Sequence, residues 1–175
     1  MNNKTIWITG ASSGIGKSLA LKFAKEGWKV AISARRENLL NEISKSNDSI
    51  NAFPLDVTDK EKCKSVFSEV KEKLGEIDIS VFCTGIHDPK SEKTLNLEKV
   101  REIMEVNFFG TINSINAVYE YYKSKKSGQI SIVSSVAVIG VFRLRVLIVH
   151  LNQPYLVLLR AYILILKEVT SEYLL

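Results

Sequence analysis

Short apolar segments alternate with longer amphipathic segments along the chain as far as residue 135. The apolar segments have the length of buried strands and cover residues 5–9, 29–33, 51–55, 77–82 and 129–133. The segments between them place apolar residues three and four positions apart, which predicts helices over residues 14–26, 37–45, 60–74 and 97–125. Strands that alternate with helices in this way are typical of α/β proteins. We therefore predict a doubly wound parallel sheet with helices on both faces.

The pattern breaks down near Gly140. Beyond this residue, Leu, Val and Ile follow one another without a strand or helix period, basic residues interrupt the apolar runs, and no further glycine occurs. Local patterns that contradict the preceding fold argue against its continuation. We predict a folded domain over residues 1–140, an aberrant tail over residues 141–175, and a sheet that is incomplete at its C-terminal side.

The composition fits one globular domain, or part of one. The chain has 175 residues, of which 46% are hydrophobic, and this supports a real core but not two domains of ordinary size. The net charge of +5 comes from basic residues spread along the chain. Their one tight group, at residues 123–126, suits a solvated helix end better than a nucleic-acid surface. We expect no nucleic-acid partner.

The start of the chain and the cysteines indicate a cytoplasmic protein. Residues 1–4 lead directly into an apolar strand, without the features of a secretory signal. Cys63 and Cys83 have no metal-ligand or redox spacing, which fits a reducing compartment and predicts no metal site. The longest uncharged run in the tail, residues 146–159, contains polar residues and proline and is shorter than the ~20 residues of a membrane span. We predict no membrane partner.

Three glycines lie where the first predicted strand leads into the first predicted helix, in the sequence TGASSGIG of residues 9–16. At such a junction, backbone N–H groups and the positive end of the helix can hold a pyrophosphate. Gly10 permits the turn, Gly14 lets the backbone approach the ligand, and Gly16 allows close packing of the helix on the sheet. The alternative is a turn that binds no ligand. The position of the glycine sequence between a strand and a helix favours cofactor binding. The predicted contacts are Gly10, Ser12, Ser13, Gly14, Ile15 and Gly16.

The end of the second predicted strand indicates which dinucleotide binds. It reads Ser33-Ala34-Arg35-Arg36, without the acidic residue that would bind a ribose 2′-hydroxyl. Two guanidinium groups suit a 2′-phosphate instead. We therefore predict NADP as the cofactor, with Arg35 and Arg36 in contact with it. The alternative is that these arginines only cap the edge of the sheet.

These features resemble the short-chain dehydrogenase/reductase family, whose signature glycine spacing is Gly-x-x-x-Gly-x-Gly and whose sheet is of the Rossmann type. The resemblance covers about residues 4–140. It implies that Asp56 and Val57 contact the adenine, that Asn107 is the asparagine of the catalytic helix, and that Ser135 is the catalytic serine.

One motif of the family is altered in this chain. Where the family usually has Asn-Ala-Gly after the fourth strand, this sequence has Cys83, Thr84 and Gly85. The resemblance implies that Gly85 still lets the backbone approach the cofactor. It also implies that a side-chain hydrogen bond bracing the fourth strand is lost.

The resemblance further implies hydride transfer between NADP(H) and a carbonyl or alcohol of a small-molecule substrate. In the family, a tyrosine exchanges a proton with the substrate oxygen, and a lysine four residues later lowers the pKa of that tyrosine. The serine polarises the carbonyl, and the asparagine supports a proton-relay water. In this chain the thirteenth residue after Ser135, where the tyrosine is expected, is Ile148, and four residues later stands Asn152. We therefore predict that the chain in this form is inactive.

One lost nucleotide near residues 138–142 would explain the missing pair. Each original codon would then combine the third base of one present codon with the first two bases of the next. A Leu147 codon ending in T, followed by the AT of Ile148, gives tyrosine. A Leu151 codon ending in A, followed by the AA of Asn152, gives lysine. With the base added back, the tyrosine falls thirteen residues after the serine, so we interpret residues from about 140 onward as out-of-frame translation.

Other interpretations remain open at the level of sequence. The tail could be a genuine divergent segment that supplies a new general acid. Alternatively, the chain could be a non-catalytic dinucleotide-binding or interaction module that uses the glycine loop for regulation. The sequence does not identify the small-molecule substrate. A homo-oligomer is one possible state of the intact form.

Overall fold

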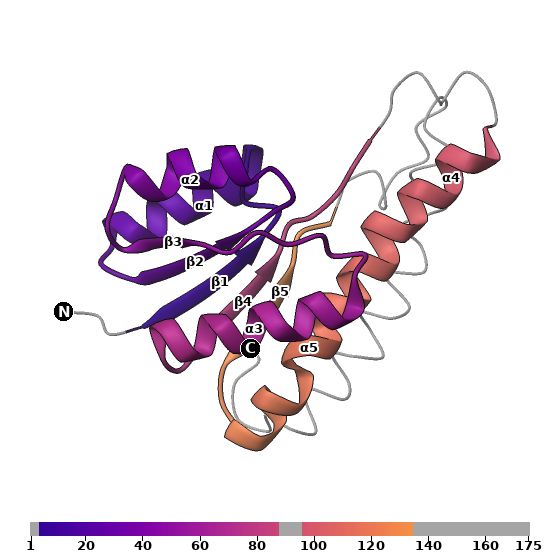
Figure 1. Cartoon of the computed structure of the whole chain (residues 1–175). Helices are drawn as coiled ribbons and strands as arrows, with labels where there is room; N and C mark the ends of the chain where they lie inside the picture. Colours follow the sequence, from indigo (N-terminus) through magenta and orange to yellow (C-terminus); the bar gives the residue numbers. More distant parts are fainter. Residues whose placement is uncertain (1–3, 88–95, 135–175) are drawn as a thin grey trace.

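The structure is a computed structural model that describes residues 4–87 and 96–134, and these residues form a parallel sheet covered by helices (Figure 1). Buried apolar segments form the strands β1 (Thr5–Thr9), β2 (Lys29–Ser33), β3 (Ile50–Ala52), β4 (Ile79–Phe82) and β5 (Gln129–Ile132). Neighbouring strands all pair in parallel, in the order β3-β2-β1-β4-β5. This arrangement confirms the predicted doubly wound, Rossmann-type sheet.

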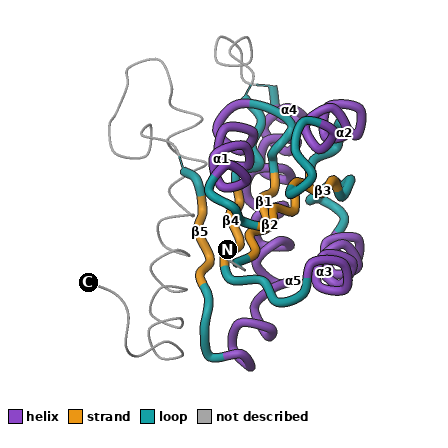
Figure 2. Tube along the Cα trace, turned by 90° about the vertical axis from the view of Figure 1, so that its left-hand side faces the viewer, coloured by secondary structure: helices purple, strands orange, loops and turns teal. Residues whose placement is uncertain are grey.

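Helices cover both faces because the chain moves outward from β1 to β3 and then crosses back to β4. The helices are α1 (Gly14–Lys25), α2 (Glu37–Lys45), α3 (Lys60–Leu74), α4 (Leu97–Ile103) and α5 (Gly110–Lys125). A π-helical segment, η2 (Met104–Phe109), joins α4 to α5. Helices α1 and α2 lie on one face of the sheet, and α3 and α5 lie on the other (Figure 2).

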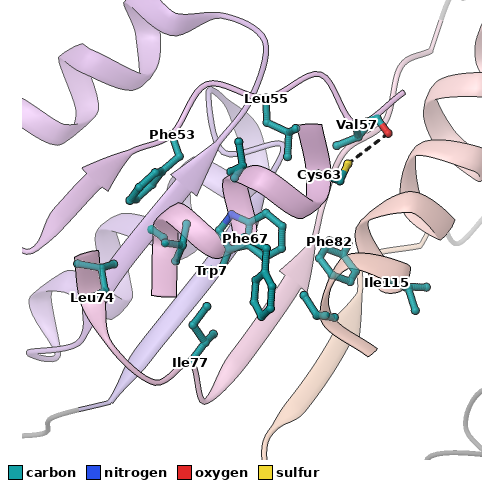
Figure 3. Close-up of a cluster of buried hydrophobic side chains, with 14 of the residues drawn as sticks. Trp7, Phe53, Leu55, Val57, Cys63, Phe67, Leu74, Ile77, Phe82 and Ile115 are labelled. Carbon is teal, nitrogen blue, oxygen red and sulfur yellow. Dashed lines mark hydrogen bonds between the residues drawn. The ribbon is translucent and has the colours of Figure 1, made fainter. Parts of the chain in front are cut away.

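Trp7 on β1 is central to the core on the α3 side of the sheet (Figure 3). Its side chain is fully buried, and its ring centroid lies 5.5 Å from that of Phe67 on α3 and 6.0 Å from that of Phe82 on β4. Its Nε1–H donates to Ser33 Oγ at 2.9 Å. An unpaired N–H at this depth would cost about 1–3 kcal/mol, so the serine is a required partner. These contacts fix β1, β2 and β4 relative to one another.

The third strand is shorter than its sequence predicts. β3 spans Ile50–Ala52 instead of residues 51–55. The chain nevertheless stays extended. The N–H groups of Phe53 and Leu55 donate to Ile32 O at 2.9 Å and to the carbonyl after β2 at 3.0 Å. This path carries residues 56–58 to the same end of the sheet as the glycine loop.

The predicted helix over residues 97–125 contains an irregularity that the apolar period did not reveal. The six residues of η2 form π-helical turns between α4 and α5, and Asn107 lies within them. Thr111 Oγ1 donates to the Asn107 carbonyl oxygen at 2.9 Å, close to the point where ordinary α-helical geometry resumes. Short π segments are frequent at functional sites, because the wider turn redirects the side chains that it carries.

Three sequence predictions concern residues that the structure does not describe. The domain boundary at residue 140, the tail over residues 141–175 and the catalytic serine Ser135 all lie outside the described residues. Within residues 4–87 and 96–134, no helix combines the length and the apolar content that a membrane span requires.

Candidate functional site

A cleft of about 600 Å³ lies at the carboxyl ends of the central strands. The register places the end of β1 beside the ends of β2 and β4, with Thr9 opposite Ser33 on one side and Phe82 on the other. The sheet order changes direction here, which is the usual ligand site of a doubly wound sheet. All residues predicted to bind the cofactor line this one cleft: Gly10, Ser12, Ser13, Gly14, Ile15, Gly16, Arg35, Arg36, Asp56, Val57 and Gly85.

The glycine loop is packed tightly against the end of β4. Gly10 has φ +70°, and a Cβ at this position would lie 2.7 Å from the backbone of Cys83 and Thr84. A Cβ on Gly16 would lie 2.6 Å from the Gly10 carbonyl oxygen. Only glycine fits at these two positions, because the obstructing atoms are backbone atoms that cannot move aside. The two glycines therefore allow the loop to pack against the end of β4 and the start of α1 to line the cleft.

The positive end of α1 is reinforced by an arginine from the next strand–helix connection. The Arg36 guanidinium donates to Ser12 Oγ, at 2.8 Å from Nη2 and 3.2 Å from Nε, and its Nη2 also donates to Ser13 Oγ at 2.7 Å. The first turn of α1 contains no acidic residue to offset this charge. Arg35 is exposed and lines the same cleft. The helix dipole and the two guanidinium groups together make this end of the cleft a site for an anion.

The loop after β3 forms another wall of the cleft. Val57 is buried, whereas Asp56 is half-buried and lines the cleft. The Asp56 carboxylate holds its own turn, since Oδ1 accepts hydrogen bonds from Thr58 N at 3.0 Å and Thr58 Oγ1 at 2.9 Å. A turn closed in this way presents a defined edge to the cleft.

Asn107 braces the loop that follows β4. Its side-chain Oδ1 accepts from Ile86 N at 2.7 Å and its Nδ2 donates to Ile86 O at 2.9 Å, so the amide pairs with both backbone groups of one residue. The side chain also lies 3.7 Å from the position that a Cβ on Gly85 would take. The neighbouring Val106 lines the cleft. These contacts make Asn107 a positioning residue for the Gly85 segment, while its catalytic role stays a prediction.

Two polar groups without partners in the described part of the chain lie at or beside the altered motif after β4. Two buried hydroxyl oxygens, Thr9 Oγ1 and Thr84 Oγ1, have no hydrogen-bond partner among the described residues. Cys83 stands between β4 and Thr84, is half-buried and lines the cleft. A thiol is a weak hydrogen-bond donor and acceptor compared with an asparagine amide. The loss of the bracing hydrogen bond, which the family resemblance implies, stays a prediction.

We expect Cys83 to react slowly with alkylating reagents, although it faces the cleft. Burial raises the pKa of the Cys83 thiol from 9.0 to about 11, which keeps the thiol protonated at neutral pH. The rate constant for iodoacetamide should still rise about tenfold between pH 9 and pH 10, where an ordinary thiol levels off. Mass spectrometry would assign the modified residue, with Cys83→Ser as the control. A rate that levels off near pH 9 would contradict the raised pKa.

Sequence reasoning missed several residues that line the cleft. These residues follow the carboxyl ends of strands or lie beside Asn107, and they are Ala34, Leu55, Thr84, Ile86, His87, Val106 and Val133. The position of a residue directly after a predicted strand is the signal that could have found most of them, because parallel strands end on the same side of the sheet.

The comparison with known protein families decides to which family the chain belongs. The sequence model of the short chain dehydrogenase family matches residues 4–144. The chain belongs to this family. The short chain dehydrogenase match includes the glycine loop, the two arginines, the loop after β3 and the π-helical segment, so the resemblance found in the sequence is confirmed.

Curated short chain dehydrogenases of similar sequence are longer than this chain. Dehydrogenase/reductase SDR family member 7 of Mus musculus is 31% identical over 121 residues, which are 65% of this chain and 36% of that protein. Dehydrogenase/reductase SDR family protein 7-like of Dictyostelium discoideum is 37% identical over 124 residues, or 63% of this chain and 39% of that protein. The chain thus spans less than half the length of these relatives.

Solved structures of short chain dehydrogenases have the same fold. The structure of ElxO with NADP bound has a TM-score of 0.80 and 25% identity, and the match covers 89% of this chain and 64% of ElxO. A short-chain dehydrogenase from Streptomyces avermitilis has a TM-score of 0.76 and 27% identity, and the match covers 86% of this chain and 56% of that protein.

Proposed function

We propose that this chain is the nucleotide-binding part of an NADP(H)-dependent oxidoreductase that acts on a carbonyl or alcohol of a small-molecule substrate. The observation that carries the proposal is the Arg36 guanidinium, which is held against Ser12 and Ser13 at the positive end of α1. A phosphate group can compete for these donors, since a guanidinium binds an anionic phosphate more strongly than a neutral hydroxyl. ElxO, which has a similar fold, contains NADP.

Each part of the cleft has a proposed role toward the dinucleotide. The glycine loop and the start of α1 hold the pyrophosphate, and Arg35 and Arg36 hold the 2′-phosphate. Asp56 and Val57 lie at the adenine, and Gly85 allows the backbone to approach the cofactor. When bound, NADPH would supply the hydride for the reaction.

The chain in its present form is proposed to be inactive. Asn107 and Ser135 are the two catalytic residues that the family resemblance assigns to it, but Ile148 and Asn152 stand where the tyrosine and lysine belong. A change of reading frame near residue 140 accounts for this, and the family match ends at residue 144, close to that point. Residues 1–140 are then the domain that binds NADP, and residues 141–175 are the aberrant tail.

The proposal is tested by titration of the full chain with NADPH and NADH, followed by an assay of NADPH oxidation with a panel of aldehydes and ketones. We expect saturable binding of NADPH, weaker binding of NADH and no turnover above the rate without protein. Failure to bind either dinucleotide would overturn the proposal.

A second candidate is a non-catalytic dinucleotide-binding or interaction module. The missing tyrosine and lysine favour it, because the glycine loop is retained while the acid–base pair is absent from its expected position. The two candidates differ in the coding DNA. If residues 141–175 are a genuine part of a binding module, the alternative reading frame is expected to contain no such tyrosine and lysine. If the chain is a frameshifted oxidoreductase, that frame contains both.

We also propose a cytoplasmic location and the absence of nucleic-acid and membrane partners. The support comes from Cys63 and Cys83, which are both free thiols as expected in a reducing compartment, and from basic residues that are dispersed rather than clustered. The intact enzyme is proposed to form a homo-oligomer. Sedimentation of a protein with the restored frame would test this last point.

Replacing Arg36 should change the preference for the cofactor. In Arg36→Ala the 2′-phosphate loses a charge-assisted partner worth about 1.5–3 kcal/mol, so the Kd for NADPH should rise about 10- to 100-fold. The Kd for NADH should change less than threefold, because NADH has no 2′-phosphate. Fluorescence titration measures both constants. Arg101→Ala removes an exposed charge from α4, outside the cleft, and serves as the control. An equal loss of affinity for NADPH and NADH would argue against a 2′-phosphate contact.

A further inference from the structure

The loop after β3, at the proposed adenine end of the cleft, is held from behind by helix α5. Asn113 Nδ2 donates to the carbonyl oxygens of Val57, at 3.0 Å, and Thr58, at 3.3 Å. The thiol of Cys63 on α3 donates to the same Val57 oxygen at 3.6 Å (Figure 3). One carbonyl group is therefore fixed by side chains from two helices.

Helix α5 meets this loop at a second point, one turn before Asn113. A Cβ on Gly110 would overlap Cγ2 of Val57, so the helix backbone packs directly on the buried valine. Residues three apart lie on the same face of a helix, and Gly110 and Asn113 thus contact the loop together. The glycine sets the distance between helix and loop, and the amide sets the orientation of the loop backbone.

These side chains act where the sheet no longer holds the loop. The last backbone hydrogen bond to the β2 side comes from Leu55, and the next one, from Asp59 to Asp56 at 3.1 Å, lies within the loop itself. Burial raises the pKa of the Cys63 thiol to about 11, so it remains a donor at neutral pH. The position of Asp56 and Val57 along the cleft therefore depends on contacts with α3 and α5.

We propose that Asn113 is a positioning residue for the adenine end of the dinucleotide site. It does not line the cleft itself, and it acts on the nucleotide by fixing the carbonyl groups of Val57 and Thr58, which orient the wall next to Asp56. This inference rests on the proposed function, because it requires a dinucleotide with its adenine at this wall. Helix α5 follows η2, so Asn107 of η2 holds the loop after β4 while Asn113 of α5 holds the loop after β3.

The test uses the full chain and etheno-NADP, an NADP analogue whose modified adenine is fluorescent. The variants are Asn113→Ala and Asn113→Asp, the second of which keeps the shape of the side chain but has no N–H to donate. Asn116→Ala is the matched control, because it removes the same side chain from an exposed position three residues further along α5. Three quantities are measured: the Kd of the analogue, iodide quenching of the bound adenine at saturation, and the melting temperature.

We expect both Asn113 variants to raise the Kd about tenfold and to make the bound adenine more accessible to iodide, while Asn116→Ala changes neither. If the Asn113 variants lower only the melting temperature and leave the shielding of the adenine at saturation unchanged, the residue is purely structural and the inference is wrong. If Asn113→Ala does not fold, Asn113→Asp decides between the same outcomes. If the unchanged chain does not bind the analogue, the proposed function fails, and the inference fails with it.

Discussion

Insertion of one nucleotide in the codons for residues 138–142 is expected to convert an inactive chain into an oxidoreductase. The restored frame would place a tyrosine thirteen residues after Ser135 and a lysine four residues later, where Ile148 and Asn152 now stand. A positioned general acid contributes about 10²–10⁴-fold to the rate, so NADPH oxidation with a suitable carbonyl should rise by at least that factor. The assay follows NADPH absorbance with the two proteins at equal concentration.

The first step of this experiment is to sequence the DNA across these codons and past the codon for Leu175. The alternative frame must continue with the tyrosine and lysine; an early stop, or another pair of residues, would remove the basis of the frameshift interpretation. The matched control is the restored protein with phenylalanine in place of the restored tyrosine. It should bind NADPH as tightly as the restored protein but lose most of the gained activity, because only the acidic hydroxyl is missing.

Gly10→Ala is expected to have the largest effect on folding of any single substitution in the glycine loop. Alanine at φ +70° costs about 1–2 kcal/mol, and the added Cβ would lie 2.7 Å from the backbone of Cys83 and Thr84. Overpacking of this kind costs a further 1–3 kcal/mol or so. The free energy of unfolding should fall by about 3 kcal/mol and the melting temperature by roughly 10 °C. NADPH binding should be lost as well, because the loop is forced away from β4.

Gly14→Ala separates the two causes of this loss. Gly14 also has a positive φ, +56°, but no heavy atom lies within 4 Å of the place that its Cβ would take. The backbone conformation alone should therefore cost about 1 kcal/mol of stability. Thermal and urea unfolding of both variants measure the difference. Equal losses for Gly10→Ala and Gly14→Ala would contradict the conclusion that the glycine loop is held in place by backbone contact with β4.

Much of this architecture could be predicted because strands and helices have distinct periods. The segments at residues 5–9, 29–33 and 60–74 were predicted with the bounds that the structure has. The predictions of the third strand and the long helix were less accurate, since neither the end of the ladder at Ala52 nor the π-helical turn at Asn107 leaves a trace in the apolar pattern. The hydrophobic period reports which side of an element is buried, and it is insensitive to the residue at which a ladder ends or to one wider turn.

The sequence by itself determined the class of the fold, the family, and the chemical groups at the cleft. A glycine loop between strand and helix, and two arginines after the next strand, are local features whose meaning follows from their positions along the chain. Their convergence on one cleft also follows, because parallel strands end on the same side of the sheet.

Only the tertiary structure decided which side chains hold these groups in place. Arg36 reaches Ser12 and Ser13 across the sheet end, and Asn113 holds Val57 from a position 56 residues away in sequence. The sequence marks Arg36, Ser12 and Ser13 as site residues, but neither periodicity nor a motif shows these pairings. Such contacts arise when crossovers bring α1, α2 and α5 close to the strand ends. The packing of the whole core sets how close each helix comes. At α5, the close approach also requires that Gly110 has no side chain.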